Sequence, residues 1–281
     1  MKKLFYLAIA AVVMAVGCAN ESLEQKTRDF QTKMESFEKT FTDGAAAIKE
    51  DAALTVEEQK AKISELSDKL VGELKEFCLK TIRENRNNSL GLEAFKNVQF
   101  LLDADELEAT LKSLGDSLKA NPAIQRVLEG QNAKKATKAG QPFVDFTIVQ
   151  DPENAEATTV KLSDYVGKGK YILVDFWASW CGPCKAEIPN IKAVYDKYAG
   201  EDFDVLSVAV WDKPDATVKA AKELGITWNQ IINAQEIPTN LYGIDGIPTL
   251  ILFDPDGIIL NRDLRGELIE VNVSRYVKAK K

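Results

Sequence analysis

The sequence predicts an all-helical domain followed by an α/β domain with a central mixed sheet flanked by helices. The chain has 281 residues, and a length of that order corresponds to about two domains. Residues 18–133 place apolar side chains at helical spacing, whereas residues 142–281 alternate strand-like apolar runs with helical segments. With 45% apolar and 28% charged residues, the composition is that of an ordinary globular protein.

A targeting segment precedes the two domains, and we place it at residues 1–17. Lys2 and Lys3 give it a positive start. The apolar run that follows, Leu4–Val16, is 13 residues long and too short to cross a bilayer comfortably. This arrangement is typical of a signal peptide, so we expect export to an oxidising compartment, the periplasm or cell envelope.

Cys18 follows small residues at the end of this segment, and the arrangement resembles a bacterial lipobox, in which the cysteine is lipidated and becomes the new N-terminus. One position departs from that pattern, because Ala15 stands where leucine is usual. The resemblance implies a lipid anchor at Cys18 that holds the protein on a membrane. Ordinary signal cleavage near Gly17 or Ala19 is the alternative.

Charge and composition exclude several classes of function. The chain carries 36 Lys and Arg against 43 Asp and Glu, a net charge of −7, which argues against a nucleic-acid partner. It contains no histidine, so Ser-His-Asp and Cys-His catalysis are excluded and a catalytic zinc site is disfavoured. We therefore expect no metal and no cofactor.

The helical domain, residues 18–133, shows apolar stripes and no chemical motif. The predicted helices lie near residues 22–50 (with a break at Gly44 as an option), 55–86, 89–101, 103–119 and 122–132. A dimerisation module, a spacer and a partner-docking surface are all open roles, and self-association through the long amphipathic helices is one hypothesis. A polar, basic stretch at residues 134–141 predicts a linker to the next domain.

The second domain, residues 142–281, predicts strands that alternate with helices. Strands are expected at 143–149, 171–177, 203–210 and 228–233, helices at 214–224 and 267–279, and a closing hairpin at 249–253 and 258–262. The turn Asp254–Gly257 suits that hairpin. Strands alternating with helices imply a mostly parallel sheet, and the hairpin makes it mixed.

Cys181 and Cys184 form a Cys-x-x-Cys motif, which serves either redox chemistry or zinc binding. A structural zinc site needs two more ligands, and the chain has neither histidine nor a second cysteine pair. The motif follows a buried strand and opens a predicted helix, whose N-terminus stabilises a thiolate. Cys181 is therefore the expected nucleophile and Cys184 the resolving thiol, while Cys78, beside Phe77 on a predicted helix, is expected to be buried and inert.

The segment Tyr171–Lys185 resembles the active-site segment of thioredoxins, and Pro189 matches the proline within their active-site helix. Ile247 and Pro248 resemble the family's cis-proline loop. The resemblance implies a thioredoxin-like fold for the second domain and a redox-active disulfide. It also implies a substrate-binding surface, for which the candidate residues are Trp180, Gly182, Pro183, Ile247 and Pro248.

The region from Phe203 to Tyr242 is longer than in plain thioredoxin, and Tyr242–Gly257 resembles the AhpC/TSA-related thiol–disulfide oxidoreductases of the TlpA and ResA type. Those proteins are membrane-anchored, exported reductases. A helical domain before such a module is similar to lipoproteins of the Bacteroidetes. The resemblance covers about half of the chain, and it implies protein thiols and disulfides as substrates and a membrane thiol–electron donor as a partner.

Two carboxylates near the motif are further catalytic candidates. Asp175 lies in an apolar strand and matches the buried aspartate of thioredoxins that exchanges a proton with the resolving cysteine, unless the strand is shifted and the side chain faces solvent. Glu187 lies one helical turn after Cys184 and matches a glutamate of ResA-type enzymes, with a surface glutamate as the alternative. ResA-type proteins commonly have asparagine at the position of Asp175, so the combination departs from both patterns.

Two tryptophans flank the motif. Trp180 is expected to form an exposed docking surface beside Cys181, and Trp177 to pack under the motif; a core role for both is the alternative.

The leading functional hypothesis is thus an exported, lipid-anchored thiol–disulfide oxidoreductase that acts as a reductase. Peroxide reduction of the peroxiredoxin type is an alternative, although the Thr-x-x-Cys arrangement of that family is missing at Cys181. A binding lipoprotein whose helical domain is the functional part is another.

Overall fold

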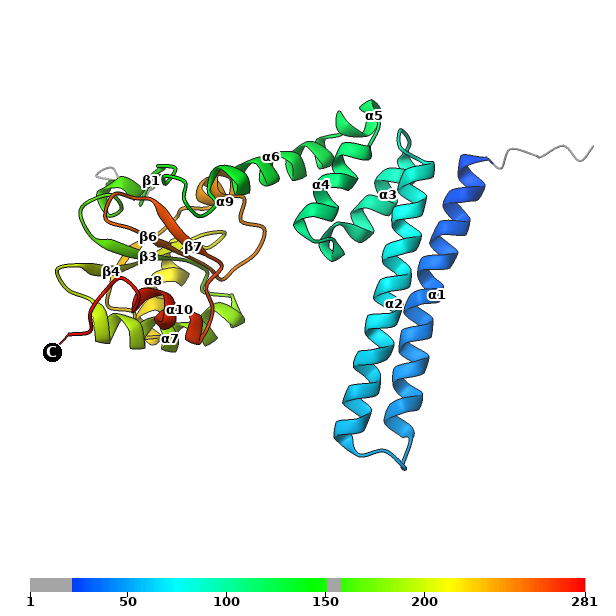
Figure 1. Ribbon diagram of the computed structural model, residues 1–281, viewed down its shortest axis with the longest axis horizontal. Coiled ribbons are helices and arrows are strands. Elements are labelled where there is room, and N and C mark those ends of the chain that lie inside the picture. The colour runs from blue at the N-terminus through cyan, green and yellow to red at the C-terminus, as the bar shows by residue number, and fades with distance from the viewer. Residues whose placement is uncertain (1–21, 151–157, 281) are drawn as a thin grey trace, which may run out of the picture. The chain divides into compact units, whose positions relative to one another are not determined.

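The computed structural model describes residues 22–150 and 158–280. The expected signal peptide and Cys18 lie outside the described residues. The chain divides into two compact units, residues 1–121 and residues 122–281 (Figure 1). Among the described residues, no helix combines the length and apolar character needed to cross a bilayer.

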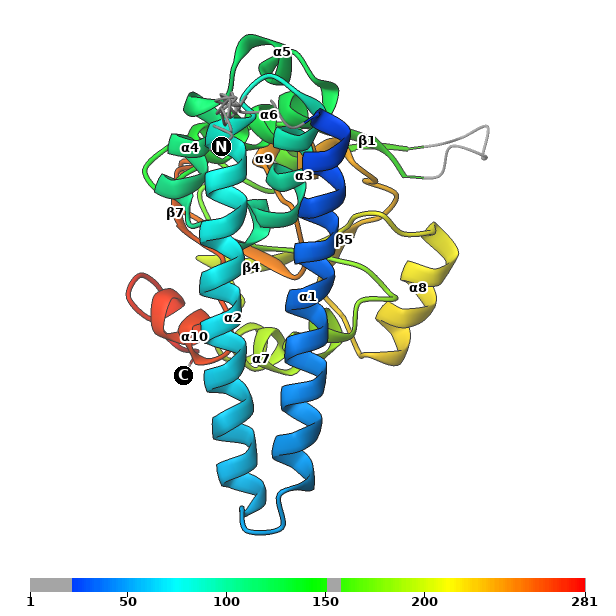
Figure 2. The same ribbon diagram turned by 90° about the vertical axis from the view of Figure 1, so that its right-hand side faces the viewer.

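The first unit is helical throughout its described part, and its two longest helices run side by side as a hairpin (Figure 2). Its elements are α1 (Leu23–Glu50), α2 (Val56–Glu84), α3 (Ser89–Val98), the short 3-10 helix η1 (Gln99–Leu101), α4 (Ala104–Ser113) and α5 (Asp116–Lys119). Local capping fixes where they begin. Thr55 and Asp103 form capping boxes with glutamates three residues later, which satisfy backbone N–H groups that a helix start leaves without partners.

Aromatic side chains hold the α1–α2 hairpin together. The rings of Phe30 and Phe77 stack with centroids 5.3 Å apart, and Phe37 contacts the same Phe77 ring at 6.1 Å. These residues belong to the predicted apolar stripes. The neighbouring Cys78 is fully buried, and this burial raises the pKa of its thiol to about 11. Little thiolate therefore forms near neutral pH, in agreement with the expectation of a buried, unreactive thiol.

One option that the sequence left open for these helices does not occur, and one expectation is wrong. Helix α1 continues through Gly44, because the missing side chain leaves room for Leu66 of α2: a Cβ at Gly44 would lie 2.6 Å from the Leu66 side chain. The single helix expected at 103–119 is two helices, because the chain turns at Leu114 and Gly115, where the Gly115 N–H donates to the Arg86 carbonyl at 2.8 Å.

The domain boundary also differs from the expected one at residue 133. Helix α6 (Pro122–Ala136) belongs to the second unit and packs against α9 (Ile237–Tyr242). Gly243 permits this contact: its φ is +60°, and a Cβ there would lie 2.4 Å from the Gly130 carbonyl oxygen. The expected linker at 134–141 is largely part of the fold, since Thr137 is fully buried and accepts a hydrogen bond from Arg262.

The second unit contains a five-stranded mixed sheet in the order β5-β4-β3-β6-β7 and a separate antiparallel pair, β1-β2. The strands are β1 (Thr147–Val149), β2 (Thr159–Lys161), β3 (Tyr171–Trp177), β4 (Phe203–Ala209), β5 (Asn229–Ile231), β6 (Thr249–Phe253) and β7 (Ile259–Arg262). The helices are α6, α7 (Gly182–Tyr198), α8 (Pro214–Glu223), α9 and α10 (Glu267–Val273), with the 3-10 turn η2 (Leu162–Asp164). Strands β3, β4 and β5 are parallel, and β6 and β7 are antiparallel to their neighbours, as the predicted hairpin requires.

Each face of the sheet has its own core. Alternate residues of β3 separate into the two faces, as a strand requires. Leu173 and Trp177 pack with both motif cysteines and with α7, α8 and α10. Val174 and Phe176 pack on the opposite face with residues of β1, β2 and α9. In Figure 1, α7 and α10 accordingly lie on one side of the sheet and α9 on the other.

Within residues 142–281, two boundaries differ from expectation by more than two residues, and two short elements were not expected. The strand expected at 143–149 is reduced to Thr147–Val149, because the backbone N–H and carbonyl of Val144 bond to the hydroxyl of Tyr242 at 3.0 and 2.9 Å and not to a neighbouring strand. The last helix ends at Val273. Helix α9 and strand β2 were not expected.

Candidate active site

The two motif cysteines lie where β3 passes into α7. They form a disulfide with the Cα atoms 5.2 Å apart. Cys181 is the N-cap residue of α7, and its Sγ accepts a hydrogen bond from the Cys184 backbone N–H at 3.1 Å. A thiolate at this position would receive the same N–H bond and the favourable field of the helix N-terminus. The local setting predicted from the sequence is therefore present.

The cis-proline loop lies against Cys181. The peptide bond between Ile247 and Pro248 is cis, and the Ile247 carbonyl oxygen is 3.7 Å from Cys181 Sγ. Both sulfur-bearing residues are buried, whereas Gly182 and Pro183 between them are exposed. The structure thus brings together all the predicted substrate-binding positions of the motif and the loop.

Asp175 is buried in the sheet on the same face as the cysteines. It shares the alternation of Leu173 and Trp177, and 1% of its surface is exposed, so the alternative of a solvent-facing side chain is wrong. Its Oδ2 accepts a hydrogen bond from the Ser207 hydroxyl at 3.3 Å, while Oδ1 has no partner among the described residues. Burial raises the pKa of Asp175 to about 7. A group with this pKa can accept or donate a proton near neutral pH.

Glu187 of α7 is buried, not a surface residue. Its Oε1 accepts hydrogen bonds from the Gly266 N–H at 2.7 Å and from Asn190 Nδ2 at 2.8 Å. Next to Gly266, the Arg265 guanidinium donates to the Pro248 carbonyl. The segment before α10 is thus tied to α7 at one end and to the cis-proline loop at the other.

Trp180 and Trp177 have different surroundings. Trp180 is 61% exposed, and its indole N–H donates to the Trp211 carbonyl at 3.0 Å. Trp177 is fully buried in the core beside both cysteines. The two rings therefore match the expectation of one exposed and one buried tryptophan.

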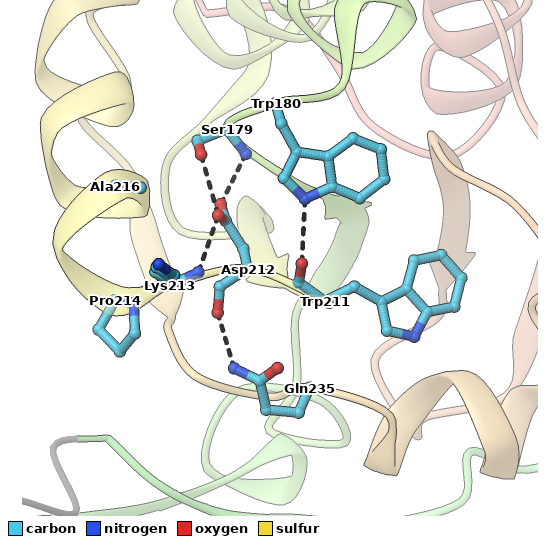
Figure 3. A pocket seen from close by; sticks show the side chains of 8 residues that line it. All are labelled: Ser179, Trp180, Trp211, Asp212, Lys213, Pro214, Ala216 and Gln235. Atoms are coloured by element: carbon cyan, nitrogen blue, oxygen red, sulfur yellow. Dashed lines mark hydrogen bonds between the residues drawn. The ribbon is translucent and has the colours of Figure 1, made fainter.

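Asp212 ties the turn that carries the motif to the start of α8. Its carboxylate accepts from the Ser179 N–H at 2.6 Å, the Ser179 hydroxyl at 2.9 Å and the Thr217 hydroxyl at 2.9 Å. It also accepts from the Lys213 N–H at 2.8 Å. Figure 3 shows the donors of Ser179 and Lys213 converging on this carboxylate. A buried carboxylate with four donors is fully satisfied, so Asp212 is a structural tie.

A cleft of about 470 Å³ opens beside Trp180 (Figure 3). The cleft is lined by Ser179, Trp180, Trp211, Asp212, Lys213, Pro214, Ala216 and Gln235. It lies beyond the carboxyl ends of the parallel strands β3 and β4, where ligands of α/β sheets usually bind. Of the residues that line this cleft, only Trp180 was identified as a candidate from the sequence. The available signal was the position of Trp211 and Asp212, directly after a predicted buried strand that pairs with β3.

The sequence over residues 139–262 matches the model of the AhpC/TSA family. The chain is 29% identical over 146 residues to the thiol-disulfide oxidoreductase ResA of Geobacillus thermodenitrificans, a similarity that covers 52% of this chain and 80% of the relative. The protein is a thiol–disulfide oxidoreductase whose C-terminal domain is similar to the AhpC/TSA family. ResA of Bacillus subtilis is 25% identical to this chain over 144 residues, with 51% of this chain and 76% of the relative covered.

Solved structures resemble the same C-terminal domain. The thioredoxin domain of a thiol-disulfide oxidoreductase from Bacteroides vulgatus is 29% identical, covers 50% of this chain and 98% of its own, and has a TM-score of 0.44. A putative thiol:disulfide interchange protein DsbE from Chlorobium tepidum is 27% identical, with coverages of 49% and 96% and a TM-score of 0.41. The C-terminal domain is thioredoxin-like, as the sequence around the motif predicts.

Proposed function

We propose that the protein is an exported, membrane-anchored disulfide reductase that cycles the Cys181–Cys184 pair between dithiol and disulfide. The observation that carries the proposal is the position of this pair, at the start of α7 and against the cis-proline loop. The Gly-Pro dipeptide between the cysteines is that of thioredoxins, for which the reduction potential is low, about −270 mV. A low potential favours donation of electrons to a substrate disulfide.

In the proposed reaction, the Cys181 thiolate attacks one sulfur of a substrate disulfide, and the other substrate sulfur leaves as a thiolate. The product is a mixed disulfide on Cys181. Asp175 in its carboxylate form takes the proton of the Cys184 thiol, and Cys184 then attacks the Cys181 sulfur. The second substrate thiol leaves, so the substrate gains two electrons and the enzyme ends as the disulfide. A membrane thiol–electron donor would return the enzyme to the dithiol.

Substrate contact is proposed along the exposed surface around the motif. Gly182, Pro183 and Trp180 face solvent, and Ile247 and Pro248 border Cys181. The cleft beside Trp180 extends this surface toward Lys213. Together they suit an extended polypeptide that presents its cysteine to Cys181.

Trapping tests the reaction. Cys184→Ser, reduced and mixed with envelope proteins, should accumulate mixed disulfides on Cys181, because the resolving thiol is absent. They appear as adducts on non-reducing gels and are located by mass spectrometry. Cys181→Ser is the matched control and should form none. No adduct with Cys184→Ser, or a reduction potential above about −150 mV, would contradict the reductase role.

Anchoring is proposed at Cys18, from the charged start, the apolar run and the small residues before this cysteine. In cells fed a labelled fatty acid, the wild-type protein should carry label and sediment with membranes. Cys18→Ser should lose both properties. A labelled Cys18→Ser protein, or an unlabelled wild-type protein, would contradict the anchor.

Peroxide reduction is a second candidate, because the AhpC/TSA family model matches the domain. The sequence has Ala178 where the Thr-x-x-Cys arrangement of peroxiredoxins requires threonine. Consumption of hydrogen peroxide in step with oxidation of the dithiol would favour this candidate over disulfide reduction.

A further inference from the structure

The hydroxyl of Ser207 lies between the carboxylate of Asp175 and the indole of Trp228. Ser207 is fully buried, and it is the register partner of Asp175 on the neighbouring parallel strand. The Trp228 Nε1–H donates to Ser207 Oγ at 2.9 Å, and Ser207 Oγ donates to Asp175 Oδ2 at 3.3 Å. All three side chains lie on the sheet face that carries the cysteines.

The direction of these hydrogen bonds is set by chemistry. An indole N–H can only donate, so the Ser207 oxygen must be the acceptor of the first bond. A hydroxyl has one proton, and with its oxygen already engaged by Trp228 that proton points to the carboxylate. Oδ2 therefore has a fixed donor, whereas Oδ1 is buried and has no partner among the described residues.

We propose that Ser207, oriented by Trp228, is a positioning residue that keeps Oδ2 of Asp175 as a hydrogen-bond acceptor and leaves Oδ1 as the atom that takes up and releases the proton. This inference rests on the proposed role of Asp175 as the base for Cys184. It specifies which oxygen acts, and it assigns a task to two residues that the motif itself does not contain.

Other groups also act on the charge of Asp175. Arg265, from the segment before α10, favours the carboxylate, and Glu187 of α7 disfavours it. The register neighbour on β6 is Leu250, which is apolar and fully buried. Desolvation is the largest influence and favours the protonated form, and the Ser207 bond opposes it more than Arg265 does. Removal of the Ser207 hydroxyl should therefore shift the carboxyl titration to higher pH.

The test is a direct titration of Asp175 in the oxidised full-length protein, where neither cysteine of the disulfide titrates. Aspartate labelled with ¹³C at the carboxyl carbon is followed by NMR, and the signal of Asp175 is assigned by its loss in Asp175→Asn. In Ser207→Ala the midpoint should rise by about one pH unit, the low end of the effect expected for a hydrogen bond to a charged group. In Trp228→Phe it should rise by a smaller amount, because the hydroxyl is kept but loses its fixed orientation.

Two further variants complete the test. Ser207→Cys places a weaker donor at the same site and should give a titration midpoint of Asp175 between those of the wild type and Ser207→Ala. If Ser207→Ala does not fold, a raised midpoint in Ser207→Cys is the test. Thr239→Ala is the matched control, since it removes another buried hydroxyl of the same domain, one that donates to the Glu236 carbonyl. An unchanged or lowered midpoint in the folded Ser207 variants overturns the inference.

Turnover separates this inference from the proposed function. The rate of protein-disulfide reduction should change with pH around an apparent pKa, seen as one limb of the pH–rate profile. This apparent pKa should shift between variants by the same amount as the NMR titration midpoint of Asp175. If the carboxyl midpoint moves and the limb does not, Ser207 still positions Asp175, but Asp175 is not the base for Cys184. If neither moves in Ser207→Ala, the inference itself is wrong.

Discussion

Asp175 places a carboxyl group in an apolar core, and the effect of this group on the free energy of unfolding depends on pH. Burial raises its pKa from the usual 3.8 to about 7. The folded protein therefore holds a proton between about pH 4 and 7 that the unfolded chain has released. In this window the unfolded state binds fewer protons than the folded state, so folding stability falls as the pH rises.

Asp175→Asn tests this consequence. Each pH unit in the window changes the free energy of unfolding by about 1.4 kcal/mol, so the wild type should lose on the order of 4 kcal/mol between pH 4 and 7 through this group. Asp175→Asn should lack that part of the decrease and be the more stable protein at pH 8. Urea unfolding of the oxidised protein at pH 5 and pH 8 measures both differences. If the free energy of unfolding changed equally with pH in the two proteins, Asp175 would be ionised at both pH values.

Trp180 is the second residue with a distinct prediction. Its indole is exposed, and the bond to the Trp211 carbonyl holds the ring at the edge of the cleft. Trp180→Ala should raise KM for a protein disulfide about five- to tenfold, the cost of losing one aromatic anchor, with little change for a small disulfide reagent. Val271→Ala, which trims an exposed apolar side chain on α10, is the control. Equal losses for large and small substrates would place the role of Trp180 in the chemistry.

At the scale of the elements, Asp212 joins the turn after β3 to the N-terminus of α8. Asp212→Asn replaces one acceptor oxygen by an NH₂ group that faces donors, so it should lower the free energy of unfolding by about 1–3 kcal/mol. Asp215→Asn is the matched control, because Asp215 is an exposed first-turn acid of the same helix and its loss should cost about 0.3–1 kcal/mol. Denaturant unfolding compares the two. An equal effect of both substitutions would mean that the hydrogen bonds of Asp212 contribute nothing beyond its charge.

The elements also differ in how well the sequence predicts them. Helix starts in the first unit follow from local residues, because Thr55 and Asp103 cap the helices that they precede. The optional break at Gly44 does not occur, because Gly44 makes room for the Leu66 side chain of another helix. The strand expected at 143–149 is likewise shorter than predicted. The hydroxyl of Tyr242, 98 residues from Val144 in the chain, forms the hydrogen bonds of both the Val144 N–H and the Val144 carbonyl.

At the scale of the whole chain, helix α6 belongs to the redox domain. Its Lys134 pairs with Asp245 at 2.6 Å, and the following Thr137 accepts from Arg262, which also donates to the Tyr242 carbonyl at 2.8 Å. A stable fragment of the redox domain should therefore begin at the start of α6, at residue 122.

Fragments test this boundary. A fragment of residues 122–281 should unfold cooperatively and be more stable than one of residues 142–281 by about 2–4 kcal/mol. The shorter fragment loses the α6–α9 packing and leaves the half-buried Arg262 without the Thr137 acceptors. Thermal unfolding of both oxidised fragments, with and without Arg262→Met, measures the difference. Equal stability of the two fragments would place the boundary at residue 142 after all.

The sequence by itself determined the redox pair and its place between a strand and a helix, and the resemblance to thioredoxins implied a buried Asp175 and a cis bond before Pro248. The pair and its setting depend on residues that are close together in the chain. Only the tertiary structure decided what Asp175 faces, where the redox domain begins and how Trp180 and Asp212 form a cleft. The Asp175–Ser207 bond joins residues 32 positions apart, and it exists because of the register between β3 and β4. Registers and contacts of this kind depend on how distant segments pack, which no local pattern in the chain encodes.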